Sequence, residues 1–329
     1  MTKSLGLHSS LAAAEQTVAQ HGLVAVASGV GLHSGVKSVV QIRRAEAALS
    51  ESPTFEARMG DQFVSAPALV SRLSGTARAT ALVLRGPAHL RCELRTVEHY
   101  LAALYVMGLE PLSAQIESST DDGTSADIFE MPILDGSAKR WLDILKVFSA
   151  YRPTRRKAWK LVRSFEVRDD DKYVVMSPLE NDAGKLDISC RVDFGFHWQQ
   201  QSEYTLAWND LDRSLEDFKK RIAPARTFGF VHELEALRKR GLALGGSMDN
   251  AILLDGDTVM NPGGFLCENE LAAHKLLDIV GDFALLGKPL IGRIDTFKSG
   301  HSMHVRAAQE AIKTGAVVEV EMDSSGKIY

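Results

Sequence analysis

Short apolar runs, separated by turn residues, dominate the first third of the chain. Residues 22–29 and 36–42 read as two strands joined by Gly-Leu-His-Ser-Gly, with His33 at the tip of the turn. Runs of 4–8 apolar residues bounded by turn residues are typical of a small antiparallel sheet. The same pattern predicts further strands at 63–67, 79–84, 88–92 and 112–117. A Gly-rich turn after a strand can also cradle phosphate, but the spacing here is not GxGxxG, so a hairpin is favoured.

Helical spacing first appears after residue 96. Leu101, Leu104 and Tyr105 recur at helical intervals, and Gly108 is a natural stop. Thr96 is a good N-cap residue, which places Glu98 and His99 in the first turn of this helix. A second helix is expected at 138–148, capped by Ser137 after an Asp-Gly turn at Asp135.

A basic, proline-containing joint at 150–157 divides the chain. We expect an N-terminal domain at 1–152 and a C-terminal domain at 153–329. The second half restarts with strands at 159–167, 172–178 and 186–194, then a helix at 210–221. Near its end a strand at 289–297 precedes a helix from His301 to about 312. The two halves look alike, which suggests an internal structural repeat.

A strand–helix–strand unit at about 228–262 interrupts the second half. A row of apolar side chains in such a unit usually packs into the hydrophobic core. This unit, however, is small for the number of apolar side chains that it carries. We therefore also carry the hypothesis of a groove for a hydrophobic ligand, lined by Leu234, Leu237, Leu242, Leu244 and Met248.

The stretch 269–282 reads as one helix that carries His274 and Asp278. Residues four apart lie on one face of a helix, with Cβ atoms about 5–6 Å apart. An imidazole and a carboxylate are therefore neighbours on a largely apolar helix. Such a pair is either half of a metal site or a surface pair, and the spacing alone leaves both readings open.

Composition excludes several classes of protein. The net charge of −4 argues against a general nucleic-acid or membrane binder. No apolar run approaches the roughly 18–20 residues of a membrane span. The three cysteines are far apart, so a disulfide framework or a cysteine zinc site is not expected. The N-terminus lacks a secretory core and is free of acidic residues until Glu15, a weak feature of organelle-targeting segments.

A catalytic zinc site needs three protein ligands and one open position. If His274 and Asp278 supply two, His99 is the best third ligand because Glu98 stands beside it. A glutamate next to a ligand histidine can act as general base. His301 can then serve as the general acid that protonates a departing amine.

Six motifs together resemble the UDP-3-O-acyl-N-acetylglucosamine deacetylases of lipid A biosynthesis. The resemblance runs from about residue 22 to residue 312, and six motifs in order are far more specific than any one. They are Thr-Val-Glu-His at 96–99, Pro-Ile-Leu-Asp-Gly-Ser at 132–137, Ala-Arg-Thr-Phe-Gly-Phe at 225–230, Leu-Gly-Gly-Ser-Met-Asp-Asn-Ala at 244–251, His-Lys-Leu-Leu-Asp-Ile-Val-Gly-Asp at 274–282 and Lys-Ser-Gly-His at 298–301.

The resemblance implies a zinc hydrolase, with ferrous iron as the alternative ion, that removes acetate from the nitrogen of an acylated UDP-sugar. It implies an α+β fold of two similar domains, each a mainly antiparallel sheet packed on helices (a β-α-α-β sandwich), with the active site between them. The matching metal ligands are His99, His274 and Asp278, and the matching catalytic residues are Glu98 (base), His301 (acid), Asp282 (orienting carboxylate), Thr227 (oxyanion) and Lys275 (substrate phosphate).

The resemblance also implies substrate-binding positions. Phe228 and Phe230 match sites for sugar and nucleotide, and 234–248 match an acyl passage. His33 and Lys298 lie in motifs near the expected cleft, and Asp135 becomes a candidate for supporting the site. The expected partner is a small-molecule acylated UDP-sugar, and we expect a monomer without nucleic-acid partners or an integral membrane segment.

Two features depart from bacterial members. Residues 75–80 are polar where many members are apolar near the cleft mouth, and the polar loop at 118–127 resembles plant homologues. The expected location is the cytoplasm for a bacterial protein, or a mitochondrion or plastid for a eukaryotic one. The alternative function is a catalytically weak homologue that binds an acylated nucleotide sugar; a dehydrogenase is a distant third.

Overall fold

The computed structural model describes residues 16–19, 22–45, 51–119, 127–180, 184–195 and 197–329. The first half forms a sheet in the order β1-β2-β3-β9-β4-β5-β7-β8-β10, with β6 paired to β7. Its pairings are antiparallel except β4–β9 and β8–β10. Its strands are β1 (Gln16–Ala19), β2 (Gly22–Val30), β3 (Lys37–Arg44), β4 (Thr54–Met59), β5 (Gln62–Pro67), β6 (Leu73–Gly75), β7 (Ala81–Arg85), β8 (Arg91–Arg95), β9 (Leu112–Ser119) and β10 (Ile128–Glu130).

The second half forms its own sheet, in the order β12-β13-β19-β11-β20, with β14 paired to β19 and β15. A small sheet β16-β17-β18 stands apart from it. The strands are β11 (Arg155–Leu161), β12 (Phe165–Asp169), β13 (Lys172–Ser177), β14 (Lys185–Asp193), β15 (Gln199–Ala207), β16 (Phe228–Phe230), β17 (Ile252–Asp255), β18 (Thr258–Val259), β19 (Leu290–Phe297) and β20 (Val317–Asp323).

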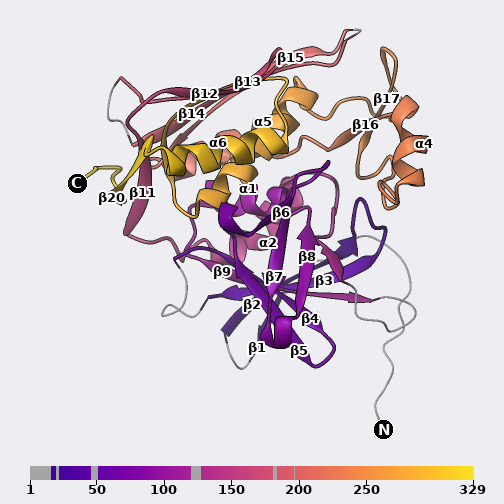
Figure 1. The fold of residues 1–329 in the computed structure, drawn as a ribbon, viewed down its shortest axis with the longest axis horizontal. Helices are drawn as coiled ribbons and strands as arrows, with labels where there is room; N and C mark the ends of the chain where they lie inside the picture. The colour runs from indigo at the N-terminus through magenta and orange to yellow at the C-terminus, as the bar shows by residue number, and fades with distance from the viewer. Residues whose placement is uncertain (1–15, 20–21, 46–50, 120–126, 181–183, 196) are drawn as a thin grey trace.

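The helices, except the one beside the small sheet, lie between the two large sheets (Figure 1). The helices are α1 (Glu98–Met107), α2 (Lys139–Leu145), α3 (Leu211–Arg221), α4 (Val231–Lys239), α5 (Glu270–Phe283) and α6 (His301–Lys313). The order sheet–helix–helix–sheet confirms the predicted α+β fold of mainly antiparallel sheets packed on helices. The helix α4 lies with β16 and β17 at one side, so the predicted strand–helix–strand unit is present.

The helices α1 and α5 pack against each other in the middle of the molecule. Gly281 permits this contact, because a Cβ atom at that position would lie 2.1 Å from the carbonyl oxygen of Glu98. Both helices are buried on most of their length. The contact brings the first turn of α1 against the middle of α5.

Several local expectations are wrong. Thr96 does not cap α1: its φ is +59° and its hydroxyl donates to the Glu130 carboxylate at 2.8 Å. The strand expected at 88–92 is instead β8, because Ala88 and His89 adopt positive φ in a 3-10 turn. The strand expected at 159–167 divides into β11 and β12, which lie apart in the same sheet.

The hairpin around His33 is confirmed, since β2 and β3 pair antiparallel on either side of it. The loop expected at 118–127 lies mostly outside the described residues, as does most of the N-terminal segment. Among the described helices, none is long and apolar enough to cross a membrane.

Candidate metal centre

Two helices from opposite halves of the chain bring three candidate ligands together. His99 lies in the first turn of α1, and His274 and Asp278 lie on one face of α5. The Asp278 Oδ1 atom is 3.5 Å from Nε2 of His274 and 3.8 Å from Nε2 of His99. All three side chains are buried, at the floor of a cleft of about 590 Å³.

These three groups have the protonation that metal ligands need. Burial lowers the pKa of His99 to about 3 and also lowers the pKa of His274. The Nδ1 atom of His274 is 3.0 Å from the Ala225 carbonyl oxygen, so it carries the proton and leaves the Nε2 lone pair free. Burial alone would raise the pKa of Asp278, but Lys275 and the neighbouring histidines hold it well below its ordinary value.

The geometry fits a divalent ion. Within the described part of the chain, Asp278 Oδ1 is a buried oxygen without a hydrogen-bond partner. Two ligands about 2.0–2.2 Å from one tetrahedral ion lie roughly 3.3 Å apart. The observed separations of 3.5 and 3.8 Å are close to that value. An ion among these atoms would satisfy the oxygen that the protein leaves without a donor.

Lys275 contacts the ligand set. Its ammonium group lies 2.6 Å from the second oxygen of Asp278, and 5.6 Å from the ring centre of Phe228. Asp278 raises the pKa of Lys275 against the opposing effect of burial. Lys275 lines the cleft while it neutralises the carboxylate.

Glu98 lies beside the ligands and is almost fully buried. One of its oxygens accepts a hydrogen bond from the backbone N–H of Thr80 at 3.1 Å. Burial raises the pKa of Glu98 to about 8. Glu98, Asp278 and His301 present atoms within 4.8 Å of one another. A carboxyl group with a raised pKa, next to a potential metal site, is suited to proton transfer.

His301 begins α6 and lines the same cleft as Glu98. Its Nδ1 atom donates to Asp282 at 2.8 Å. Burial would lower the pKa of His301, but Asp282, Asp278 and Glu98 raise it to about 9. The carboxylates therefore outweigh the helix dipole, which disfavours a cation at an N-terminus. The raised pKa favours the imidazolium form of the ring at neutral pH.

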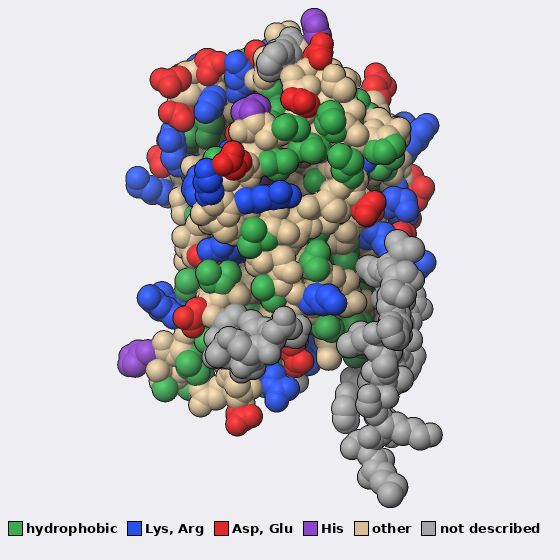
Figure 2. All heavy atoms as spheres, turned by 90° about the vertical axis from the view of Figure 1, so that its right-hand side faces the viewer, with side chains coloured by type: hydrophobic (Ala, Val, Ile, Leu, Met, Phe, Trp, Pro, Cys, Tyr) green, Lys and Arg blue, Asp and Glu red, His purple; other side chains and the backbone are tan. Residues whose placement is uncertain are grey.

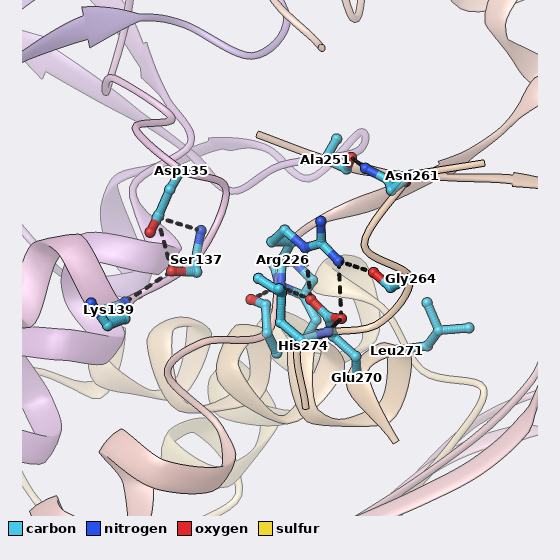
Figure 3. Close-up of polar contacts among 12 residues, drawn as sticks. Asp135, Ser137, Lys139, Arg226, Ala251, Asn261, Gly264, Glu270, Leu271 and His274 are labelled. Atoms are coloured by element: carbon cyan, nitrogen blue, oxygen red, sulfur yellow. Dashed lines mark hydrogen bonds and ion pairs between the residues drawn. The ribbon is translucent and has the colours of Figure 1, made fainter. Parts of the chain in front are cut away.

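The segment 225–227 is fixed by a buried ion pair between Arg226 and Glu270. Figure 3 shows the Arg226 guanidinium between the Glu270 carboxylate (2.9 Å) and the Gly264 carbonyl (2.7 Å). The Arg226 backbone N–H also donates to Glu270 at 3.0 Å. The residue before Arg226 is Ala225, whose carbonyl oxygen orients the His274 ring. The residue after it is Thr227, which lines the cleft. Glu270 therefore positions both.

An apolar cavity of about 300 Å³ opens beside the cleft, against the β16–α4–β17 unit. Leu234, Leu237, Met248 and His33 line it. Leu242 and Leu244 are not among its lining residues, and the Leu244 side chain is 53% exposed. Figure 2 shows hydrophobic side chains gathered on this face of the molecule. The cleft and the cavity share Thr227 and Phe228 as lining residues.

The remaining predicted residues lie at the edges of the site. Phe230 and Lys298 line the cleft, and Lys298 forms ion pairs with Asp171 (3.0 Å) and Asp193 (3.2 Å). Asp135 accepts hydrogen bonds from the backbone and hydroxyl of Ser137, as a turn residue does (Figure 3).

Sequence reasoning missed four residues of the site. Thr80, His304, Arg226 and Glu270 had no assigned role, although each contacts or positions an expected residue. His304 carried a readable signal, because it follows His301 by three residues on a predicted helix and so shares its face. The other three residues make contacts between distant segments (Thr80 with Asp282, and Arg226 with Glu270), which spacing along the chain cannot reveal.

Comparisons with known proteins identify the family. The profile of a family described as UDP-3-O-acyl N-acetylglycosamine deacetylase matches residues 16–313. A protein named UDP-3-O-acyl-N-acetylglucosamine deacetylase from Xylella fastidiosa (strain 9a5c) is 35% identical over 279 residues, covering 84% of each chain. Its namesake from Myxococcus xanthus (strain DK1622) is 32% identical over 298 residues, covering 90% of this chain and 87% of its own. The chain belongs to the UDP-3-O-acyl-N-acetylglucosamine deacetylase family, whose members are metal-dependent amidohydrolases.

Proposed function

We propose that this protein is a zinc-dependent deacetylase that hydrolyses the N-acetyl amide of UDP-3-O-acyl-N-acetylglucosamine and releases acetate, a step of lipid A biosynthesis. The observation that carries the proposal is the convergence of His99, His274 and Asp278, with Glu98 and His301 beside them. Family membership supplies the substrate class. Ferrous iron is the alternative ion, since an imidazole and carboxylate set accepts either metal.

The ion would be held by Nε2 of His99, Nε2 of His274 and Oδ1 of Asp278. When bound, a divalent ion acidifies water and polarises the amide carbonyl. Its positive charge would also lower the pKa of Glu98 from about 8, which restores the carboxylate that a general base must be.

Two neighbouring groups divide the proton transfers. Glu98 accepts the proton of the water that attacks the amide carbon, and the Thr227 hydroxyl donates to the oxygen on which charge develops. When His301 is an imidazolium, both ring nitrogens carry protons: the Nδ1–H donates to Asp282, and the proton on Nε2 can be transferred. It gives that proton to the departing amine. The environments of the two groups support this division between base and acid.

The substrate would occupy both hollows. The acyl chain fits the apolar cavity lined by Leu234, Leu237, Met248 and His33, with Leu242 and Leu244 nearby. Phe228 and Phe230 offer aromatic faces to the sugar and nucleotide, and Lys275 and Lys298 offer positive charge to the diphosphate.

Further proposals concern the organisation of the chain. We place the domains at 1–152 and 153–329, with the acyl passage in an insert at 228–262, because each large sheet takes its strands from one half. We propose a monomer. The reported relatives are bacterial, so we propose a bacterial cytoplasmic location and find no support for an organelle.

A deacetylation assay on the acylated UDP-sugar tests the function. We expect activity that a chelator removes and that added Zn²⁺ or Fe²⁺ restores. The variants His99→Ala and Asp278→Ala should contain far less metal than the wild type by elemental analysis. His89→Ala, the same change at an exposed histidine of the first half, should retain metal. Bound substrate without turnover in the metal-loaded protein would instead favour the catalytically weak homologue.

A further inference from the structure

One carboxylate oxygen in the site accepts hydrogen bonds from two histidines. Oδ2 of Asp282 is 2.8 Å from Nδ1 of His301 and 2.8 Å from Nδ1 of His304. The other oxygen, Oδ1, accepts the hydroxyl of Thr80. His304 is completely buried, and Asp282 is too. The carboxylate that orients the proposed acid is therefore held at three points, one of which is a second imidazole.

The hydrogen bonds of His304 define its tautomer. Nδ1 must carry the proton, because its partner is a carboxylate. Nε2 lies 2.8 Å from the hydroxyl oxygen of Ser299, so in the neutral ring it accepts from that hydroxyl. Burial lowers the pKa of His304, which favours this neutral form. Ser299 and His301 both line the cleft. The series of hydrogen bonds Ser299–His304–Asp282–His301 therefore begins and ends at the cleft.

A second metal site formed by Asp282, His301 and His304 is a competing interpretation, since their ligand atoms lie close together. The distances argue against it. Two ligands of one tetrahedral ion are roughly 3.3 Å apart, whereas each imidazole nitrogen is 2.8 Å from the shared oxygen. A separation of 2.8 Å is that of a charge-assisted N–H···O hydrogen bond.

We propose that His304 is a positioning residue for His301: its Nδ1–H holds the Asp282 carboxylate in the one orientation that keeps the His301 ring in place at the cleft. The proposal rests on the proposed function, in which His301 protonates the leaving amine. His301 and His304 lie one turn apart at the start of α6, so a single rigid element presents both rings to one carboxylate.

The physical reason lies in the freedom of the carboxylate. With only His301 on Oδ2, the carboxylate could pivot about its bond to Thr80, and the imidazole would follow it. The second donor removes that motion. Groups that orient a metal-bound imidazole typically contribute about 10- to 100-fold in affinity or activity, and we expect a similar size of effect for an imidazole that transfers a proton. We expect His304 to stabilise the transition state and not the bound substrate, because the His301 ring must be aligned at the moment when the proton moves.

A matched pair of variants tests the proposal. His304→Asn keeps an N–H donor at the place of Nδ1 and lacks Nε2, whereas His304→Leu has the same branched shape and no donor. We expect kcat to fall about 10- to 100-fold in His304→Leu, with KM nearly unchanged. His304→Asn should recover most of that loss. Equal loss in both variants, or a change in KM alone, would show that His304 only fills space.

Two measurements keep the outcome unambiguous. Metal content and thermal unfolding are recorded for both variants, since a loss shared by both would come from the fold. Should His304→Leu not fold, nitrogen NMR of histidine-labelled wild type decides, with His304 assigned by its absence from His304→Asn. We expect a neutral ring protonated on Nδ1, and a ring protonated on Nε2 overturns the proposal. A wild type that is inactive with metal would instead refute the proposed function.

Discussion

The imidazole of His99 and the carboxylate of Asp278 face each other across the two halves of the chain, with Nε2 3.8 Å from Oδ1. Burial lowers the pKa of His99 and so favours its neutral form, and Oδ1 of Asp278 accepts no hydrogen bond from the described residues. In the proposed metal site, a divalent ion would lie between these two atoms and bind both. This arrangement depends on the packing of α1 against α5.

Gly281→Ala tests that packing. Alanine normally stabilises a helix interior by about 1 kcal/mol relative to glycine. Here the added methyl group would meet the Glu98 backbone, so we expect a loss of about 1–3 kcal/mol in the free energy of unfolding. Denaturant titration measures it. Gly263→Ala is the control, because nothing lies within 4 Å of the added atom. A Gly281→Ala protein as stable as the wild type would contradict the close contact.

Glu98→Gln tests the general base. The amide has the same shape but cannot accept the proton of water, so we expect kcat to fall by roughly two to four decades. The metal content should stay at the wild-type level, because Glu98 is not among the three proposed ligands. Steady-state kinetics and elemental analysis on the same preparation measure both. Near-full activity in this variant would remove Glu98 from the role.

Asp282→Asn tests the acid. His301 must be protonated to act, so activity falls as pH rises through its pKa, which is raised to about 9. Removing the negative charge of Asp282 lowers that pKa, and the basic limb of the pH–rate profile should move to lower pH by about 1–3 units. Asp135→Asn, at a carboxylate that serves a turn, should leave the limb in place. An unmoved limb in Asp282→Asn would refute the assignment.

Glu270→Gln tests the buried ion pair. Glu270 is 0% exposed, and its loss leaves the Arg226 cation buried without a counter-charge. We expect the free energy of unfolding to fall by about 3–5 kcal/mol. Asp217→Asn removes the partner of Arg221 in an exposed pair on α3 and should cost only about 0.3–0.5 kcal/mol. Denaturant titration measures both changes. Similar losses of unfolding free energy in the two variants would show that the buried pair stabilises the fold no more than the exposed pair.

Local spacing could be read from the sequence because it depends on the period of one element. His274 and Asp278 are four residues apart in a segment free of helix breakers, so their shared face follows from helix geometry. The hairpin at His33 and the strand–helix–strand unit at 228–262 were predictable for the same reason. The prediction that Thr96 caps the helix was wrong, because the Thr96 hydroxyl donates instead to the buried carboxylate of Glu130, which is distant in sequence.

The sequence by itself therefore determined that His274 and Asp278 share a helix face, and where the hairpin and the strand–helix–strand unit form. Only the tertiary structure decided that His99 meets Asp278, that Thr80 and His304 share Asp282, and that Arg226 pairs with Glu270. The reason is that periodicity fixes neighbours within a helix or strand. Contacts between elements depend on how their buried faces pack together, as at Gly281, and no spacing along the chain records that packing.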